Sequence, residues 1–130
     1  MNPSRSFKDV IAWQKAHQLV LRSYKLSETF PKSEVFGLTA QLRSAAVSVA
    51  ANIAEGFRRT GLKDKNRFFN ISQASLDECI YYYILAQDLE YADTTSIQLQ
   101  ADEVGRVLDA YIKAINKKYL GNNKREASNE

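Results

Sequence analysis

The chain has 130 residues, of which 45% are hydrophobic and 25% charged, with five Gly, two Pro and one Cys. This length fits one domain with a substantial core, and so few Gly and Pro favour long helices. No stretch approaches the roughly 18 apolar residues that cross a bilayer, and the first residues lack the apolar run of a secretion signal. The composition excludes a membrane protein and a disulfide scaffold, and we expect one all-α, cytoplasmic domain.

The net charge of +3 hides a separation along the chain. Residues 1–67 hold 12 Lys and Arg against 5 Asp and Glu, whereas residues 68–105 hold none against 7. The last 25 residues hold 6 against 3. We therefore expect a strongly polarised molecule, with one basic surface and one acidic surface.

Two helices are predicted in the first half of the chain. The first covers about 8–29 and ends before Pro31, which disfavours helix at the preceding residue. The second covers about 34–59, with Ser33 as N-cap and Gly61 as the stop. Hydrophobic spacing of three and four predicts their core faces. These faces are Val10, Trp13, His17, Val20 and Tyr24 in the first helix, and Val35, Leu38, Leu42, Ala45, Val49 and Ile53 in the second.

Two more helices follow, over about 63–91 and 95–119, with a disordered tail at 120–130. Their predicted core faces are Phe69, Ser72, Leu76, Cys79, Tyr83 and Ala86, then Ile97, Ala101, Val104, Leu108, Tyr111 and Ile115. Short connections between long helices favour an up-down-up-down antiparallel four-helix bundle over 1–119. Cys79 is expected to be a buried thiol.

The third helix carries more apolar surface than one bundle core needs. Its apolar positions span roughly 260° of the helix circumference at 100° per residue. Three consecutive tyrosines also point in three directions, so they do not all enter one core. We expect a second buried surface against another copy of the chain, formed by Tyr81, Tyr82, Leu85 and Leu89. The small residues from Ala45 to Ala51 allow another helix to come close, from the same chain or a neighbour.

Three segments resemble a known family. They are AWQKAHQLV at Ala12–Val20, the stretch Phe30–Gly56, and SLDE at Ser75–Glu78. The clearest signature lies in the second segment, where Gln41-Leu42-Arg43 is followed by small residues and by Asn52-Ile53-Ala54-Glu55-Gly56. From Phe7 to about Tyr119 the chain resembles the bacterial four-helix-bundle proteins encoded in intervening sequences of large-subunit ribosomal RNA genes. It departs at Ser44-Ala45 and at Ala74.

The resemblance implies an antiparallel four-helix bundle that assembles into a ring-like homopentamer. It also implies similarity to the accessory proteins of diversity-generating retroelements, which bind nucleic acid and a reverse transcriptase. It implies no reaction. Together with the wide apolar face, it makes a homo-oligomeric ring our expected assembly.

The interhelical turn at 58–67 is the best functional clue. It carries five cations, Arg58, Arg59, Lys63, Lys65 and Arg67, against Asp64 alone. The first two complement the negative end of the second helix, but the other three crowd the positive end of the third. That arrangement favours an anion, and phosphate contacts are the candidate. Phe57, Phe68 and Phe69 flank the turn as stacking platforms or as core, and a merely solvated charge run is the alternative.

Polar residues near the end of the second helix form a second candidate. Asn52 and Glu55 lie within one turn of each other and, if partly buried, need partners such as Arg43 or tyrosine hydroxyls. A structural network that fixes helix register is favoured over a ligand pocket. The only His and the only Cys lie on different helices, and no Gly-rich phosphate loop is present. We expect no enzyme, no metal and no cofactor, with His17 as a packing residue.

Two functions from different classes remain open. The first is an oligomeric accessory protein that binds RNA or DNA through the basic turn, with Arg22, Lys25, Lys117 and Lys118 as secondary contacts. The second is a structural module that docks a protein partner on its acidic surface, from Asp77 to Glu103, or on its wide apolar face. Neither involves a membrane.

Overall fold

The computed structural model describes the backbone of residues 4–129 and the side chains of residues 4–121. Over that range the chain forms four α-helices and two short 3-10 helices, with no strand. In chain order they are η1 (Phe7–Asp9), α1 (Ile11–Ser27), η2 (Lys32–Glu34), α2 (Leu38–Arg58), α3 (Leu62–Asp88) and α4 (Thr95–Asn129). The expected all-α class is confirmed. Across residues 4–129 no helix is long and apolar enough to cross a membrane.

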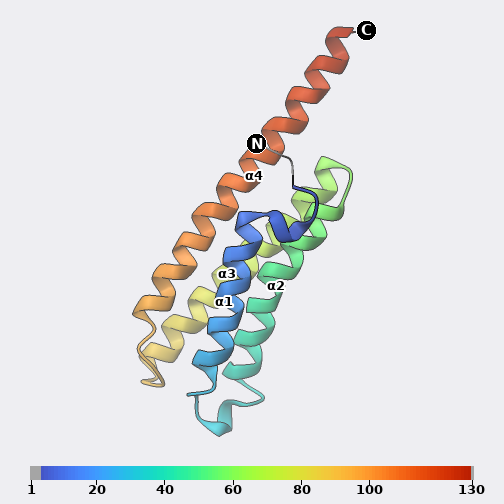
Figure 1. Cartoon of the computed structure of the whole chain (residues 1–130). Helices are drawn as coiled ribbons and strands as arrows, with labels where there is room; N and C mark the ends of the chain where they lie inside the picture. The colour runs from blue at the N-terminus through green and yellow to red at the C-terminus, as the bar shows by residue number, and fades with distance from the viewer. Residues whose placement is uncertain (1–3, 130) are drawn as a thin grey trace.

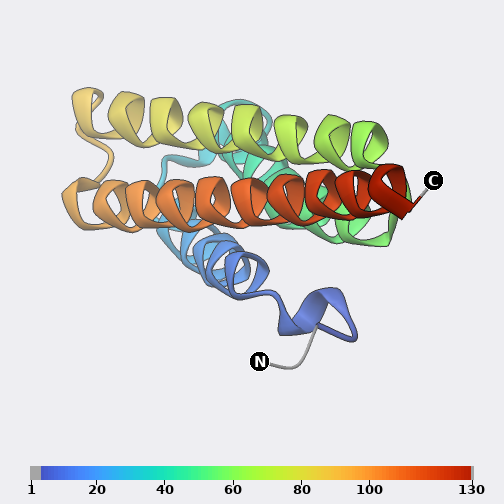
Figure 2. The same cartoon turned by 90° about the horizontal axis from the view of Figure 1, so that it is seen from above.

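The four long helices pack side by side, and the chain turns back at each of their three connections (Figure 1). Both α1 and α3 pack against α2 and α4. α3 and α4 run alongside each other, whereas α1 leans away from them at an angle (Figure 2). The α2–α3 turn lies at the same end of the molecule as the start of the chain, and the other two connections lie at the opposite end.

The buried face of α1 differs from the predicted one, although Val10 just before the helix is buried and Trp13 and Val20 pack partly against the core. Small residues fill the buried face, together with one leucine, and they are Ala12, Ala16, Leu19, Ser23 and Ser27. The bulky residues predicted for the core, from Trp13 to Tyr24, lie half-buried or exposed beside this face. Small side chains let α1 approach α2 and α4 closely, and the buried Ser23 hydroxyl is satisfied by the Tyr83 hydroxyl at 2.6 Å.

α2 begins four residues later than predicted. Glu34, expected inside the helix, instead accepts a hydrogen bond from the Leu38 amide at 3.3 Å. Its other carboxylate oxygen accepts from the Tyr91 hydroxyl at 2.8 Å. Val35 and Phe36 are therefore exposed in the connection, Phe36 to 94%. The Ser33 cap was wrong because the carboxylate of Glu34, held by a tyrosine distant in sequence, stabilises the first turn instead.

The predicted face of α3 is confirmed, and that of α4 is confirmed over its first four positions, whereas Tyr111 and Ile115 are only half-buried. All six positions from Phe69 to Ala86 are buried, and so are Ile97, Ala101, Val104 and Leu108. The free thiol of Cys79 is buried as expected. The predicted disordered tail at 120–130 differs from the structure, which continues α4 to Asn129, and residue 130 lies outside the described residues. Helix growth from an existing end adds one hydrogen bond per residue fixed, and no Pro interrupts it here.

Candidate nucleic-acid interface

The basic turn joins the end of α2 to the start of α3. Arg58 is the last residue of α2 and is exposed, and Lys63 is exposed in the first turn of α3. Gly61 is the N-cap of α3 and offers no side chain to the free amides of that turn. The local helix ends therefore leave cations and unpaired backbone N–H groups at one surface, an arrangement that attracts anions.

Two arginines of the turn stack on one aromatic ring. The guanidinium of Arg59 lies 4.6 Å from the centroid of Phe68, and that of Arg67 lies 4.8 Å from it. Arg59 also forms an ion pair with Glu55 at 3.2 Å, and Arg67 with Asp64 at 3.3 Å. These exposed pairs contribute little stability, but together with the ring they fix the direction of both guanidinium groups.

Lys65 is not available for phosphate binding, contrary to the sequence prediction. Its side chain is buried, and its ammonium donates to the carbonyl oxygens of Gly56 at 3.1 Å and Phe57 at 2.8 Å. Burial, and secondly the charge of Lys118, lower the pKa of the Lys65 ammonium. Lys65 therefore satisfies unpaired carbonyls at the end of α2, a role that the sequence did not reveal because it requires α3 to fold back on α2.

The far part of α4 completes this end of the molecule. Asn66 and Asn116 exchange amide hydrogen bonds at 2.8 and 2.9 Å, which ties the start of α3 to α4. The Tyr119 hydroxyl lies 3.4 Å from the carbonyl oxygen of Thr60 in the turn. The charge of Lys118, which was predicted as a secondary contact, also lowers the pKa of the Lys65 ammonium.

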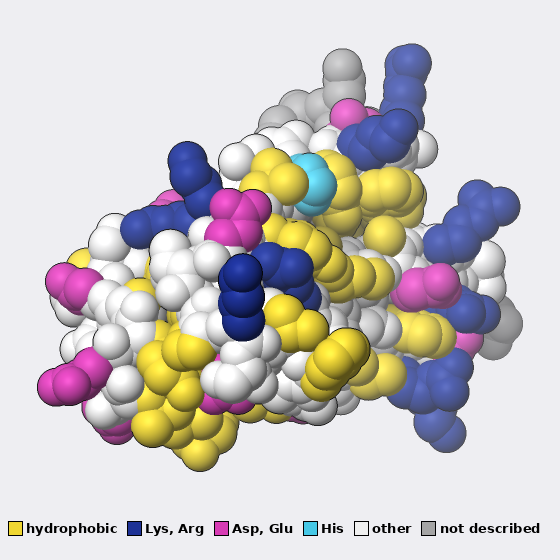
Figure 3. Space-filling view, turned by 90° about the horizontal axis from the view of Figure 1, so that it is seen from below, with side chains coloured by type: hydrophobic (Ala, Val, Ile, Leu, Met, Phe, Trp, Pro, Cys, Tyr) yellow, Lys and Arg dark blue, Asp and Glu magenta, His cyan; other side chains and the backbone are white. Residues whose placement is uncertain are grey.

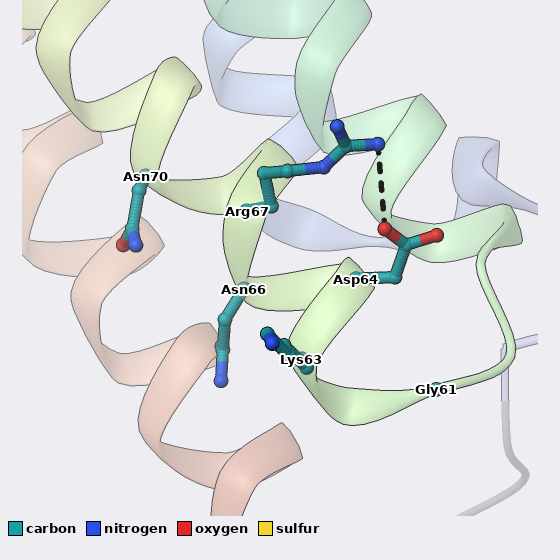
Figure 4. Close-up of a pocket in the computed structure, with 6 residues that line it drawn as sticks. All are labelled: Gly61, Lys63, Asp64, Asn66, Arg67 and Asn70. Carbon is teal, nitrogen blue, oxygen red and sulfur yellow. Dashed lines mark ion pairs between the residues drawn. The ribbon is translucent and has the colours of Figure 1, made fainter.

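A hollow of about 880 Å³, lined mainly by polar and charged residues, lies beside the start of α3. Figure 4 shows its lining, with Asn66 and Asn70 on the side of α4 and the Arg67–Asp64 ion pair on the other side. Lys63 and Gly61 complete it. The lining offers amide and cationic donors beside the Asp64 carboxylate, and such donors suit binding of an oxyanion.

The predicted polar network does not assemble. Arg43 donates to the Ser27 hydroxyl at 2.8 Å and the Tyr24 carbonyl at 3.2 Å, which links α2 to α1. Asn52 donates to the carbonyl and the hydroxyl of Ser48, at 2.8 and 2.9 Å. Glu55 pairs with Arg59, as described above. Arg43 is nine and twelve residues from Asn52 and Glu55 and lies on another side of α2, whereas Asn52 and Glu55 are one turn apart but have separate partners.

The predicted subunit interface on α3 is partly exposed. Tyr81 is 57% exposed and Leu89 46% exposed, whereas Tyr82 and Leu85 are half-buried against the core. Figure 3 shows hydrophobic side chains gathered in patches between charged ones on one face of the molecule. Tyr83, the third tyrosine of the run, is fully buried, so these residues do point in different directions as expected.

Comparisons with known proteins bear on the fold and the family. Residues 8–110 match the family model described as 23S rRNA-intervening sequence protein. The fold resembles the crystal structure of a protein with unknown function from the S23 ribosomal protein family of Bacteroides thetaiotaomicron VPI-5482. That likeness has a TM-score of 0.73 and 22% identity, covers 79% of this chain and 99% of the other, and shows the fold alone. No curated protein matches this chain.

Proposed function

Because the chain belongs to the 23S rRNA-intervening sequence protein family, we propose that it is a non-enzymatic accessory protein that binds nucleic acid, RNA in particular. In this proposal the antiparallel bundle assembles into a homo-oligomeric ring. The ring presents one basic turn per subunit. Weak phosphate contacts at each turn then add up through avidity along one nucleic-acid strand or duplex.

The observation that carries the proposal is the pair of arginines on the Phe68 ring. A guanidinium that is already oriented loses less freedom when it binds a phosphate, and its planar donors suit two phosphate oxygens. Arg59 and Arg67 are both oriented in this way. Exposed Lys63, together with Lys118 of α4, adds positive charge nearby. This combination favours the interpretation that the turn contacts a polyanion over the alternative that its charges are only solvated.

A binding role without catalysis is supported by the surroundings of the reactive side chains. Cys79 is fully buried, and burial raises the pKa of its thiol to about 12. A neutral thiol is a poor nucleophile. His17 stacks on Trp13 with ring centroids 5.1 Å apart. The Cys79 thiol is buried as the sequence predicted, whereas His17, predicted for the core, is half-buried and stacks on Trp13.

The test is a titration of a structured RNA and of a duplex DNA, at salt concentrations between about 50 and 200 mM. The oligomer mass is recorded in the same samples. Binding through phosphates makes the logarithm of the affinity fall linearly with the logarithm of the salt concentration. The variant Lys63→Glu with Arg67→Glu should weaken binding to both ligands and reduce the slope by about 1 for each cation removed.

The matched control is Lys32→Glu with Arg106→Glu. It makes the same change in net charge at exposed positions on η2 and in the middle of α4. Equal losses of affinity in the two variants would show that the effect depends on net charge alone, and would exclude the basic turn as the binding site. No binding of either ligand at physiological salt would overturn the proposed function.

A protein-docking scaffold is the second candidate, and the exposed apolar side chains support it. Phe36 is 94% exposed and Tyr81 57% exposed, so both side chains are free to contact a partner. Replacing Asp88 and Glu90 by Lys would release a partner held on the acidic surface. A co-purifying protein that stays bound to this variant would exclude that surface as the docking site.

A further inference from the structure

A second hollow, of about 540 Å³, lies between the start of the chain and the outer face of α2. Its apolar lining includes Phe7, Ala51, Ala54 and Phe57. The two alanines lie one turn apart on α2, so no longer side chain fills the space under the N-terminal segment. That segment is held in place because Ser6 and Asp9 form a capping box at η1 and Val10 is buried. We refer to this hollow as the N-terminal groove.

Charged groups stand at the rim of the N-terminal groove. Arg5 and Arg58 both line it, and Arg58 belongs to the basic turn. Glu55 also lines it and is held by its ion pair with Arg59 at 3.2 Å. An apolar floor with cations at the rim matches a ligand that has a flat apolar body and a nearby negative charge. The carboxylate of Glu55 adds an acceptor for an amino group on such a ligand.

Aromatic rings continue from the N-terminal groove along α1. Phe7 meets Trp13 edge to face with ring centroids 5.0 Å apart. Trp13 in turn stacks on His17 at 5.1 Å, with their planes 5° apart. All three side chains are half-buried, so each keeps part of its surface open to solvent. A row of partly open rings beside a basic surface is the arrangement that binds stacked bases in single strands.

We propose that the N-terminal groove holds one unstacked base of single-stranded RNA or DNA. The base lies on Phe7 and the two alanines, and Arg5 and Arg58 contact the flanking phosphates. A volume of about 540 Å³ lies within the range of small-ligand pockets. A duplex keeps its bases stacked and paired, so it reaches only the cations. This inference rests on the proposed function and deepens it, since it selects single strands as the ligand class.

The protein carries its own reporter for this groove. Trp13 is the only tryptophan, and it contacts the Phe7 ring that lines the hollow. Single-stranded oligonucleotides and duplexes of matched charge are titrated while both the Trp13 fluorescence and the affinity are followed. We expect the single strand to quench Trp13 and the duplex to leave its fluorescence unchanged.

The decisive variant is Ala51→Leu, which fills the groove from an exposed position and so leaves folding intact. It should weaken single-strand binding about tenfold and leave duplex binding and its salt slope unchanged. Ala40→Leu, at another exposed alanine of α2, is the control and should change neither. Helicity measured by circular dichroism verifies the fold of both variants.

The outcomes separate this inference from the proposed function. If Lys63→Glu with Arg67→Glu weakens both ligands but Ala51→Leu weakens neither, the basic turn stands and the groove proposal falls. If duplexes and structured RNA do not bind but single strands quench Trp13 in a way that Ala51→Leu abolishes, the groove stands and the basic turn falls. Quenching by an uncharged apolar peptide, and not by an oligonucleotide, would assign the groove to a protein partner and overturn the proposal.

Discussion

The ring of Phe69 lies against Gly56, where any other residue would carry a side chain. A β-carbon on Gly56 would come within 2.7 Å of ring atom Cδ1 and 3.2 Å of the Lys65 carbonyl oxygen. The first contact is shorter than packed atoms accept, and the second is tight. Gly56 therefore sets how closely α2 and α3 approach at the basic turn.

The variant Gly56→Ala should lower the free energy of unfolding by about 1–3 kcal/mol, since a fully buried ring has no room to move away. Gly105→Ala is the control in another helix, where the new β-carbon meets only Leu76 Cδ2 at an ordinary 3.4 Å. That change should stabilise the protein by about 0.5–1 kcal/mol through helix propensity. Urea unfolding measures both, and shifts of the same sign in the two variants would contradict the packing argument.

Lys65→Met should separate stability from binding. The variant keeps an apolar stem of similar length but leaves the Gly56 and Phe57 carbonyls without their donor. Losing hydrogen bonds from a charged group lowers the free energy of unfolding by about 1.5–3 kcal/mol. Nucleic-acid affinity, measured well below the melting temperature, should stay unchanged. A large loss of affinity in a folded Lys65→Met protein would restore Lys65 to the binding site.

Glu90 is a position where a shorter residue should stabilise the fold. It has a φ of 62°, in the left-handed region, just after α3. The Tyr91 amide donates to the Ala86 carbonyl across it, which closes the helix end. Glycine adopts this conformation without the steric cost that a β-carbon brings. Glu90→Gly should therefore raise the free energy of unfolding by about 0.5–1 kcal/mol, seen as a higher melting temperature. A lower melting temperature would show that the Glu90 side chain stabilises the turn.

Alkaline pH should weaken the fold through Cys79. Its thiol has an ordinary pKa of 9.0, which burial raises to about 12 in the folded protein. Below pH 9 the thiol is neutral in both states and has no effect. Between pH 9 and 12 the unfolded chain loses this proton while the folded chain retains it, so stability falls by up to about 1.4 kcal/mol per pH unit.

The comparison protein for this effect is Cys79→Ala, which lacks the thiol. Burial raises the pKa of Tyr83 and Tyr111 as well, so both proteins should lose stability with rising pH. The wild type should lose more, and its advantage over the variant should shrink above pH 9 in urea unfolding. A constant difference across this range would mean that the folded protein ionises the thiol as readily as the unfolded chain.

Much of the fold follows from hydrophobic spacing, but α1 shows the limit of that reasoning. Counting bulky apolar residues places Trp13 and His17 in the core, whereas close helix packing selects Ala12 and Ala16. How closely two helices pack depends on the side-chain sizes of both, so the sequence of one helix alone does not predict which of its residues are buried. The start of α2 was missed for a related reason, since its cap depends on the contact between Glu34 and Tyr91.

The candidate site was predicted in part. Charge counting located the turn at 58–67, and four of its five cations have side chains that reach the surface. The burial of Lys65 depends on carbonyls that only the folded end of α2 presents. The polar residues of α2 were expected to act together, but Arg43 reaches across to Ser27 of α1, and Asn52 donates to Ser48 one turn earlier in its own helix. The sequence shows which segment carries the charges, but only the tertiary contacts show which of these side chains remain accessible to a ligand.

The Asn66–Asn116 pair has a consequence for how α4 is aligned. Each amide is both donor and acceptor to the other, so the pair forms at a single offset between α3 and α4. Sliding α4 by one turn would break both bonds of the pair and would shift Lys118 along the molecule, leaving Asn116 only its bond to the Ile112 carbonyl of its own helix. The two asparagines therefore fix the register of α4 on α3, and with it the position of the α4 lysines relative to the arginines of the turn. Replacing one asparagine should change this register, and so the charge distribution at the turn, under conditions in which the protein is still folded.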